Sequence, residues 1–173
     1  MLNRRQFIKV GLAGAVILAA ARFLDRPLAA PAPQRRFLDE DSARIVAALV
    51  PVVLAGSLPE EAAARARITR DTVEAFDRAI SGLAPSVQEE IAQLFSFLGF
   101  APTRLAFAGL WVPIEEAPAE DLKAFLTRWR SSRFDLQRAS YHALTQLIQM
   151  SWYDTPAAWA AIGYPGPPAL EKT

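Results

Sequence analysis

Beyond residue 38, the hydrophobic and polar positions follow the spacing of amphipathic helices, and no stretch alternates as a β-strand does. Asp39 and Ser42 supply capping oxygens and negative charge for a first helix. Apolar residues then recur at helical intervals, at Ile45, Val46, Leu49 and Val53. Pro51 removes a backbone donor, so it predicts a kink or an end in this helix.

The same spacing predicts four more main helices. They run from about residue 70 to 80, from Pro85, from Pro118 and from about residue 134 to 152. Residues 58–67 are rich in alanine and charge, and they predict a solvated helical turn or a loop. The expected core positions are Val73, Phe76, Ile80, Val87, Ile91, Leu94, Phe95, Leu98, Leu122, Phe125, Leu126, Trp129, Leu136, Ala143, Leu144, Leu147 and Ile148.

Local signals mark the ends of these elements. Ser86 and Glu89 have the spacing of a capping box, and Gly99 fits the position just past a helix end. Residues 102–110 form a shorter apolar segment that Pro113 closes. We therefore predict an all-α fold: a single small domain of about five helices in an irregular bundle. An N-terminal signal helix and a linker precede it, and an extended Pro/Gly tail follows it.

The N-terminus has the layout of an export signal, because three cations precede an uncharged apolar segment, Val10 to Ala21. It resembles a twin-arginine signal, whose pattern is Ser/Thr-Arg-Arg-x-Phe-Leu-Lys. The matching positions are Arg4, Arg5, Phe7 and Lys9, whereas Asn3 and Ile8 depart from the pattern. The apolar segment is shorter than the roughly 20 residues of a free-standing membrane helix. An ordinary secretory signal or a membrane anchor is the alternative.

The resemblance implies that the twin-arginine translocase exports the chain, already folded, to the periplasm. We divide the chain into a signal at residues 1–30, a linker at 31–38 and a helical accessory-subunit domain at 39–173. Small residues around Ala21 and Ala30 offer cleavage sites, but Pro31 and Pro33 hinder cleavage at the second. An uncleaved signal that tethers the protein to the inner membrane therefore stays open.

The charge balance gives no sign of a nucleic-acid surface. The chain carries 19 basic and 18 acidic residues, and three of the basic ones lie within the first 21 residues. Removing the first 21 residues leaves a net charge of about −2, which does not favour binding to a phosphate backbone. Because the chain has no cysteine, it has no disulfide, no c-type haem attachment and no cysteine-ligated cluster.

The residue types that carry catalysis are scarce. The single histidine, His142, lies in the middle of a predicted helix without a surrounding nucleophile motif, so we interpret it as a hydrogen-bonded helix residue. One histidine cannot complete a di-metal helical site, and there is no Gly-rich phosphate loop. The carboxylate pairs at 60–61, 89–90 and 115–116 are expected to be solvated. We therefore predict no catalytic, cofactor-binding or metal-binding residue, and no enzyme activity of this chain's own.

Aromatic residues concentrate near the C-terminus, with two tryptophans and two tyrosines within thirteen residues, followed by a Pro/Gly tail. Such side chains bury large areas at protein interfaces, and an extended proline-rich tail can bind in a groove of a partner. They could equally cover the protein's own bundle. The candidate partner-binding residues are Trp152, Tyr153, Trp159, Gly163, Tyr164, Pro165, Gly166, Pro167 and Pro168.

This C-terminal pattern resembles the gluconate 2-dehydrogenase subunit 3 family. The family ends with an aromatic pair, a short turn containing proline, a tryptophan and then Gly-Tyr-x-Gly-Pro-Pro. Here Trp152-Tyr153, Pro156, Trp159 and residues 163–168 fill those places, and Leu49-Val50-Pro51 resembles an apolar-apolar-Pro stretch near the start of mature family members.

The resemblance implies a non-catalytic small subunit of a periplasmic dehydrogenase. Its partner would be a large flavoprotein of the glucose-methanol-choline (GMC) type, which holds FAD and oxidises sugars, polyols or sugar acids. The small subunit would bind that flavoprotein, support its maturation and escort it through the twin-arginine translocase. A cytochrome c is often the third subunit. The alternative is a stand-alone exported helical protein with a ligand-binding or envelope-structural role.

Overall fold

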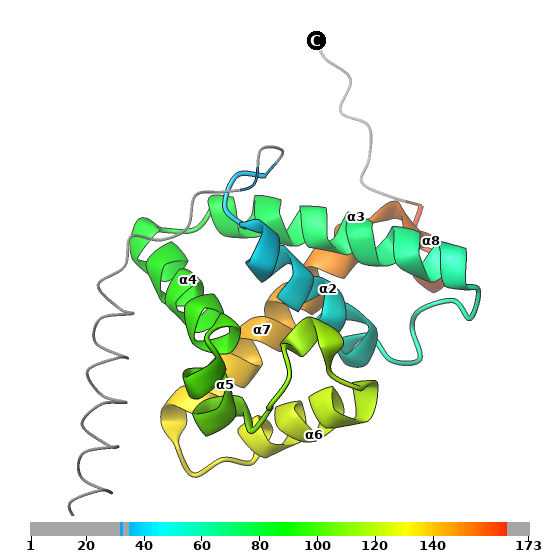
Figure 1. Cartoon of the computed structure of the whole chain (residues 1–173). Coiled ribbons are helices and arrows are strands. Elements are labelled where there is room, and N and C mark those ends of the chain that lie inside the picture. Colours follow the sequence, from blue (N-terminus) through cyan, green and yellow to red (C-terminus); the bar gives the residue numbers. More distant parts are fainter. Residues whose placement is uncertain (1–31, 33–34, 166–173) are drawn as a thin grey trace, which may run out of the picture.

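A computed structural model describes residue 32 and residues 35–165 of the chain (Figure 1). This described part contains seven α-helices, a short 3-10 helix and no β-strand, so the all-α prediction is confirmed. The predicted signal, residues 31, 33 and 34 of the linker and the tail from Gly166 lie outside the described residues. The elements are α2 (Glu40–Val53), α3 (Ala62–Ser81), α4 (Pro85–Gly99), α5 (Ala101–Ala108), η1 (Ile114–Glu116), α6 (Ala119–Arg130), α7 (Asp135–Tyr153) and α8 (Pro156–Ile162).

Helix α2 begins as its sequence predicts. The carboxylate of Asp39 accepts a 2.7 Å hydrogen bond from the backbone N–H of Ser42, which satisfies a free donor of the first turn. Pro51 lies inside the helix, and the helix ends two residues later at Val53. Because proline cannot donate to the preceding turn, the predicted end is observed at this point.

Helix α3 begins at Ala62, so the predicted start near residue 70 is wrong. Its first two turns are mostly exposed, with Ile68 as the first buried side chain, and therefore show no apolar stripe. Alanine and arginine have high intrinsic helix propensity, which supports a helix even where burial contributes little. The guanidinium of Arg65 also donates to the carbonyl oxygens of Pro59 and Glu60, tying the helix to the preceding loop.

The predicted capping box at the start of α4 is also wrong. Ala84 is the N-cap residue and Pro85 the first helical residue, and no side chain caps the helix. Instead, the side-chain amide of Gln88 donates to the carbonyl oxygen of Leu83. Gly99 is the last residue of α4 rather than the residue beyond it.

No single helix in the described part of the chain is long and apolar enough to cross a membrane. By length and composition alone, α4 and α5 would pass that test as a pair, but they are bent by 97° relative to each other.

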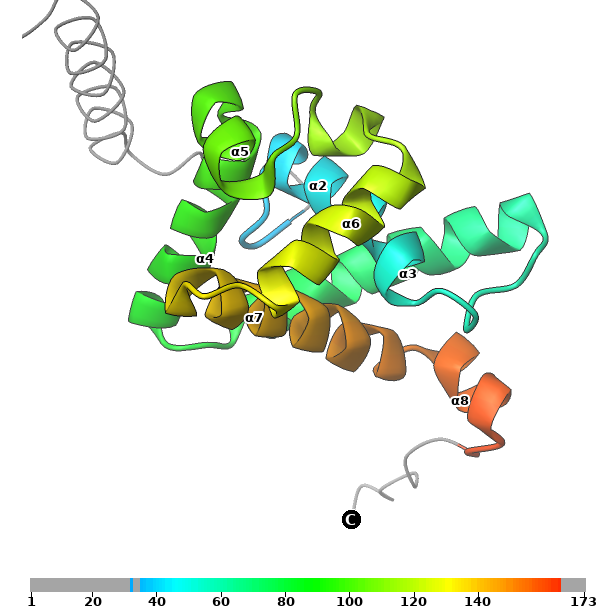
Figure 2. The ribbon, with the colours of Figure 1, turned by 90° about the horizontal axis from the view of Figure 1, so that it is seen from below.

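Helix α2 occupies the middle of the bundle. It packs against α3, α4, α6 and α7, while α7 packs against α3, α6 and α8 (Figures 1 and 2). Two aromatic pairs lie in the core: Phe76 with Phe95 at a ring separation of 6.1 Å, and Phe125 with Trp129 at 4.6 Å. The largest fully buried side chains include Phe76, Phe125, Leu38, Leu49, Ile80, Leu98, Ile114, Leu144 and Ile148.

Several predicted core residues are not buried. Val87 of α4 and Leu136 of α7 are exposed, and Leu94, Ala143 and Leu147 are only half-buried. All five face the same hollow between α4 and α7. Their apolar character was read correctly from the sequence, but no other helix among the described residues covers this part of α4 and α7.

Candidate functional site

The point where the linker joins the helical domain is held by a buried carboxylate. Asp77, on α3, accepts backbone hydrogen bonds from Arg36 at 2.8 Å, Phe37 at 2.9 Å and Leu38 at 2.7 Å. Hydrogen bonds to an ionised acceptor are stronger than neutral ones. The three hydrogen bonds to Asp77 therefore fix residues 36–38 on α3, and so fix the point where the N-terminal part of the chain leaves the domain. Sequence spacing could not find this contact, because its partners lie about 40 residues apart.

The four targeting residues, Arg4, Arg5, Phe7 and Lys9, lie outside the described residues. Gly166, Pro167 and Pro168 of the predicted partner-binding tail lie outside them as well. The structure describes the other predicted partner-binding residues, which lie between Trp152 and Pro165.

The aromatic pair at the end of α7 divides between core and surface. Trp152 is 5% exposed and belongs to the hydrophobic core, whereas Tyr153 is 51% exposed. Their ring centroids are 4.8 Å apart. Trp152 is therefore a packing residue of the domain itself, whereas its neighbour Tyr153 exposes its ring to solvent. This corrects our assignment of Trp152 as a residue in direct contact with a partner.

Helix α8 was not predicted, and it positions the other aromatic residues. Pro156 starts this helix at its first position, where a missing backbone donor costs nothing. Its buried Ala158 anchors it to the core. Trp159 is half-buried, and its indole Nε1–H donates a 2.7 Å hydrogen bond to the carbonyl oxygen of Tyr153. The indole therefore links α8 back to the end of α7.

Gly163 ends α8 in a left-handed conformation, with φ of +68°. The N–H of Tyr164 then reaches back to the carbonyl oxygen of Trp159 at 2.9 Å, as in a Schellman motif. The rings of Trp159 and Tyr164 meet edge to face at 6.1 Å. The Trp, Gly and Tyr positions of the C-terminal pattern thus form one helix-ending unit.

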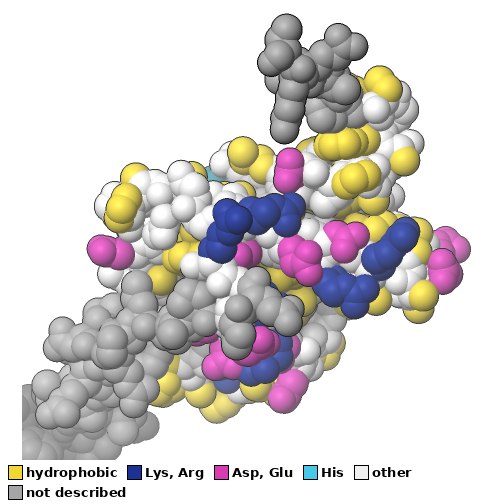
Figure 3. Space-filling model, turned by 90° about the horizontal axis from the view of Figure 1, so that it is seen from above, with side chains coloured by type: hydrophobic (Ala, Val, Ile, Leu, Met, Phe, Trp, Pro, Cys, Tyr) yellow, Lys and Arg dark blue, Asp and Glu magenta, His cyan; other side chains and the backbone are white. Residues whose placement is uncertain are grey.

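We call Tyr153, Trp159 and Tyr164 the aromatic platform. Tyr153 and Tyr164 are about half exposed, and Pro165, also exposed, continues from the platform. Figure 3 shows hydrophobic side chains gathered at several places on one face of the molecule, among charged and polar ones. The Trp159 indole is held by its hydrogen bond, and the two tyrosine rings each lie against a tryptophan. Such contacts reduce the side-chain freedom that would be lost on binding, which favours this surface as a docking site.

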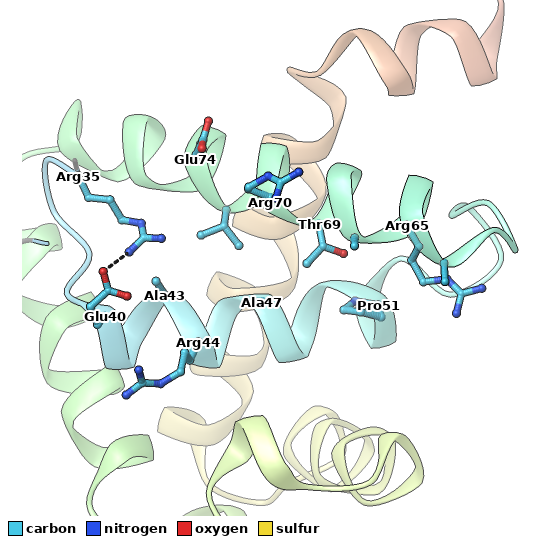
Figure 4. Close-up of a pocket in the computed structure, with 13 residues that line it drawn as sticks. Arg35, Glu40, Ala43, Arg44, Ala47, Pro51, Arg65, Thr69, Arg70 and Glu74 are labelled. Carbon is cyan, nitrogen blue, oxygen red and sulfur yellow. Dashed lines mark hydrogen bonds and ion pairs between the residues drawn. The ribbon is translucent and has the colours of Figure 1, made fainter. Parts of the chain in front are cut away.

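A second hollow lies between α2 and α3 (Figure 4) and has a volume of about 490 Å³. Its apolar walls include Ala43, Ala47 and Val73, and its rim carries four arginines and two glutamates. Arg35 pairs with Glu40 at 3.4 Å on that rim. Charges of both signs therefore surround an apolar floor, which gives no selectivity for one kind of charged ligand.

We call the hollow between α4 and α7, described with the fold above, the α4–α7 groove. It has a volume of about 430 Å³ and a largely apolar lining. Leu136 is 61% exposed and Met150 66% exposed, so both face solvent along α7. The groove differs from the aromatic platform in position, because its lining residues precede Tyr153 and belong mainly to α4 and α7.

His142 is exposed on α7 and contacts the ring of its neighbour Tyr141 at a centroid distance of 5.3 Å. Its imidazole makes no hydrogen bond to another described residue, so the expected hydrogen-bonded histidine is not observed. The carboxylate pairs at 60–61, 89–90 and 115–116 are exposed, as expected. Within the described range, no group of three or more His, Asp or Glu side chains could hold a metal ion.

No family model, curated protein or solved structure matches this chain. The resemblance at the two ends of the chain therefore stays a prediction from the residue patterns.

Proposed function

We propose that this chain is the non-catalytic small subunit of an exported FAD-dependent sugar or alcohol dehydrogenase complex. It binds a GMC-type flavoprotein subunit and escorts it through the twin-arginine translocase into the periplasm. FAD belongs to the flavoprotein, and a cytochrome c can complete the assembly. The small subunit itself contributes adhesion and targeting.

The observation that supports this proposal is the aromatic platform. Tyr153 and Tyr164 present half-exposed rings: the Tyr153 ring lies against Trp152, and the backbone turn at Gly163 brings the Tyr164 ring against Trp159. Tyrosine and tryptophan dominate the binding energy of many interfaces. The residues that build the platform are those through which the C-terminal segment resembles the family.

The proposed targeting route has a physical reason. A flavoprotein that binds its FAD before export must cross the membrane folded, because unfolding would release the cofactor. A signal with the twin-arginine pattern directs folded cargo. One such signal on the small subunit therefore suffices for both chains, provided that they bind each other in the cytoplasm.

The test is co-expression with the flavoprotein, followed by fractionation and a dehydrogenase assay. Deleting Trp152 to Thr173 would remove core residues, so the sharper variants are Tyr153→Ala, Tyr164→Ala and a truncation after Pro165. We expect each to leave this chain exported and to leave at least about half of the flavoprotein activity in the cytoplasm.

Trp111→Ala is the matched control, because Trp111 is 82% exposed and lies in the loop between α5 and η1. Its loss should not change the distribution of activity. If platform variants and control alike deliver full activity to the periplasm, the platform is not the docking surface. Export and function of this chain without any flavoprotein would instead support the stand-alone alternative.

A further inference from the structure

The α4–α7 groove leaves apolar side chains in water that the bundle does not cover. Val87 on α4 faces it, as do Leu136 and Met150 on α7. Apolar surface of this kind lowers the free energy when another apolar surface covers it. The exposed apolar side chains of the groove lie along two facing helices, so together they form a surface that one apolar segment could cover.

We infer that the chain's own apolar segment, Val10 to Ala21, binds in this groove in the full-length protein before export. The dimensions agree. Along α7 the groove runs from Leu136 to Met150, a distance of about 21 Å at about 1.5 Å per helical residue. A helix made of the dozen residues of the apolar segment would be about 18 Å long.

The N-terminal residues leave the domain close to one end of the groove. Asp77 holds Arg36 to Leu38 one helical turn before α3 ends at Ser81. Leu83, in the turn that follows α3, already lines the groove. The linker between Ala21 and Arg36 can span up to about 50 Å when extended, so it reaches the groove without strain.

The tether also favours this occupant over a separate molecule. A segment joined to its site by a short linker is present at an effective concentration on the order of millimolar. Even a weak apolar contact is then largely formed within one chain. A partner's helix or a second copy would need a higher affinity to displace it.

Charge adds to the match. Among the described residues that line the groove, Glu90 is the only charged one, and it makes no hydrogen bond or ion pair with another described residue. The cations Arg4, Arg5 and Lys9 directly precede the apolar segment. The carboxylate of Glu90 can therefore attract the cations at the N-terminal end of the bound segment.

Such a contact would keep the apolar segment away from water and membranes until the translocase binds the arginine pair. Removal of the segment after export would then open the groove. This inference does not depend on the flavoprotein partner, because it concerns two parts of one chain.

The test uses the full chain, purified from a host without the twin-arginine translocase so that the N-terminus is retained. Because the chain has no cysteine, two introduced thiols form a defined pair. Val16→Cys and Ile17→Cys, in separate proteins, are each combined with Met150→Cys in the groove. The control combines them with Glu74→Cys, an exposed position on α3 near the linker.

We expect intramolecular disulfides to form at least about tenfold faster at Met150→Cys than at Glu74→Cys. Equal rates at the two positions would overturn the inference, since they would show an unbound, freely diffusing segment. Intermolecular disulfides that increase with protein concentration would also overturn it, because the groove would then bind a second copy.

Oxidation of Met150 gives an independent measurement without cysteines. The chain has two methionines, Met1 and Met150, so peptide mass spectrometry resolves the groove residue cleanly. Hydrogen peroxide should convert Met150 to its sulfoxide several-fold more slowly in the full chain than in a Val16→Asp/Ile17→Asp variant. These substitutions lie outside the helical domain and leave its core intact. Equal oxidation rates would contradict the inference.

Discussion

The buried carboxylate of Asp77 accepts a 2.7 Å hydrogen bond from the backbone N–H of Leu38, 39 residues earlier in the chain. Leu38 is itself fully buried and belongs to the core. The contact therefore joins the end of the linker to α3 by packing and by hydrogen bonding at once. It marks the point where the linker ends and the helical domain begins.

Replacing Asp77 should destabilise the whole domain. Asp77→Ala leaves three backbone donors without their acceptor, and we expect the free energy of unfolding to fall by about 2–4 kcal/mol. Asp77→Asn should cost less, because one amide oxygen still accepts. Urea denaturation measures the difference. Asp71→Ala on the same helix is the control, since Asp71 makes no hydrogen bond or ion pair with another described residue. Similar losses in both alanine variants would contradict this assignment.

Gly109 should tolerate no side chain. It has φ of +67°, and a Cβ there would lie 2.9 Å from Nη2 of Arg128, which donates to the carbonyl oxygen of Ala108. We expect Gly109→Ala to lower the free energy of unfolding by about 1–3 kcal/mol through backbone strain and crowding.

Gly56→Ala separates those two causes. Gly56 also has a positive φ, +85°, but a Cβ there would meet nothing within 4 Å. Thermal unfolding should therefore show a smaller loss for Gly56→Ala than for Gly109→Ala. Adding Arg128→Ala to Gly109→Ala should cost less than the sum of the single changes. Additive losses would show that the arginine simply moves aside.

Replacing Trp152 or Tyr153 by alanine should lower the stability of the domain by very different amounts. Trp152→Ala removes a buried ring, and we expect a loss of about 3–5 kcal/mol in the free energy of unfolding. Tyr153→Ala removes a half-exposed ring and should cost less than about 1 kcal/mol. Guanidinium denaturation of the two variants compares them directly. If Tyr153→Ala lowers the free energy of unfolding as much as Trp152→Ala does, the Tyr153 ring stabilises the domain and is not a free docking residue.

Gly163 should control the order of the aromatic platform. Its left-handed conformation costs other L-residues about 1–2 kcal/mol, whereas asparagine adopts it more readily. We expect Gly163→Ala to speed chymotryptic cleavage after Trp159 several-fold, and Gly163→Asn to do so less; the bond after Tyr164 is resistant because Pro165 follows it. The stability of the domain core should stay unchanged in both. Identical cleavage of all three proteins would show that the platform does not depend on this glycine.

The short-range features of the fold follow from the sequence. The Asp39 cap and the apolar spacing of α2 and α6 predict the observed elements, because hydrogen bonds within a turn and a 3.6-residue period depend only on nearby residues. The resemblance at the two ends of the chain is likewise a property of the residues alone. Even the helical turns that contain few apolar residues, at the start of α3, have a local cause in helix propensity.

Tertiary structure decided which apolar residues are covered. Periodicity identifies the apolar face of α7, but it cannot say that Leu136 lies beside an open groove while Ile148 is fully buried. For the same reason, sequence could not separate Trp152 from Tyr153 or bring Asp77 to the linker. Burial depends on whether another helix comes within contact distance, and that is set by the packing of the whole bundle.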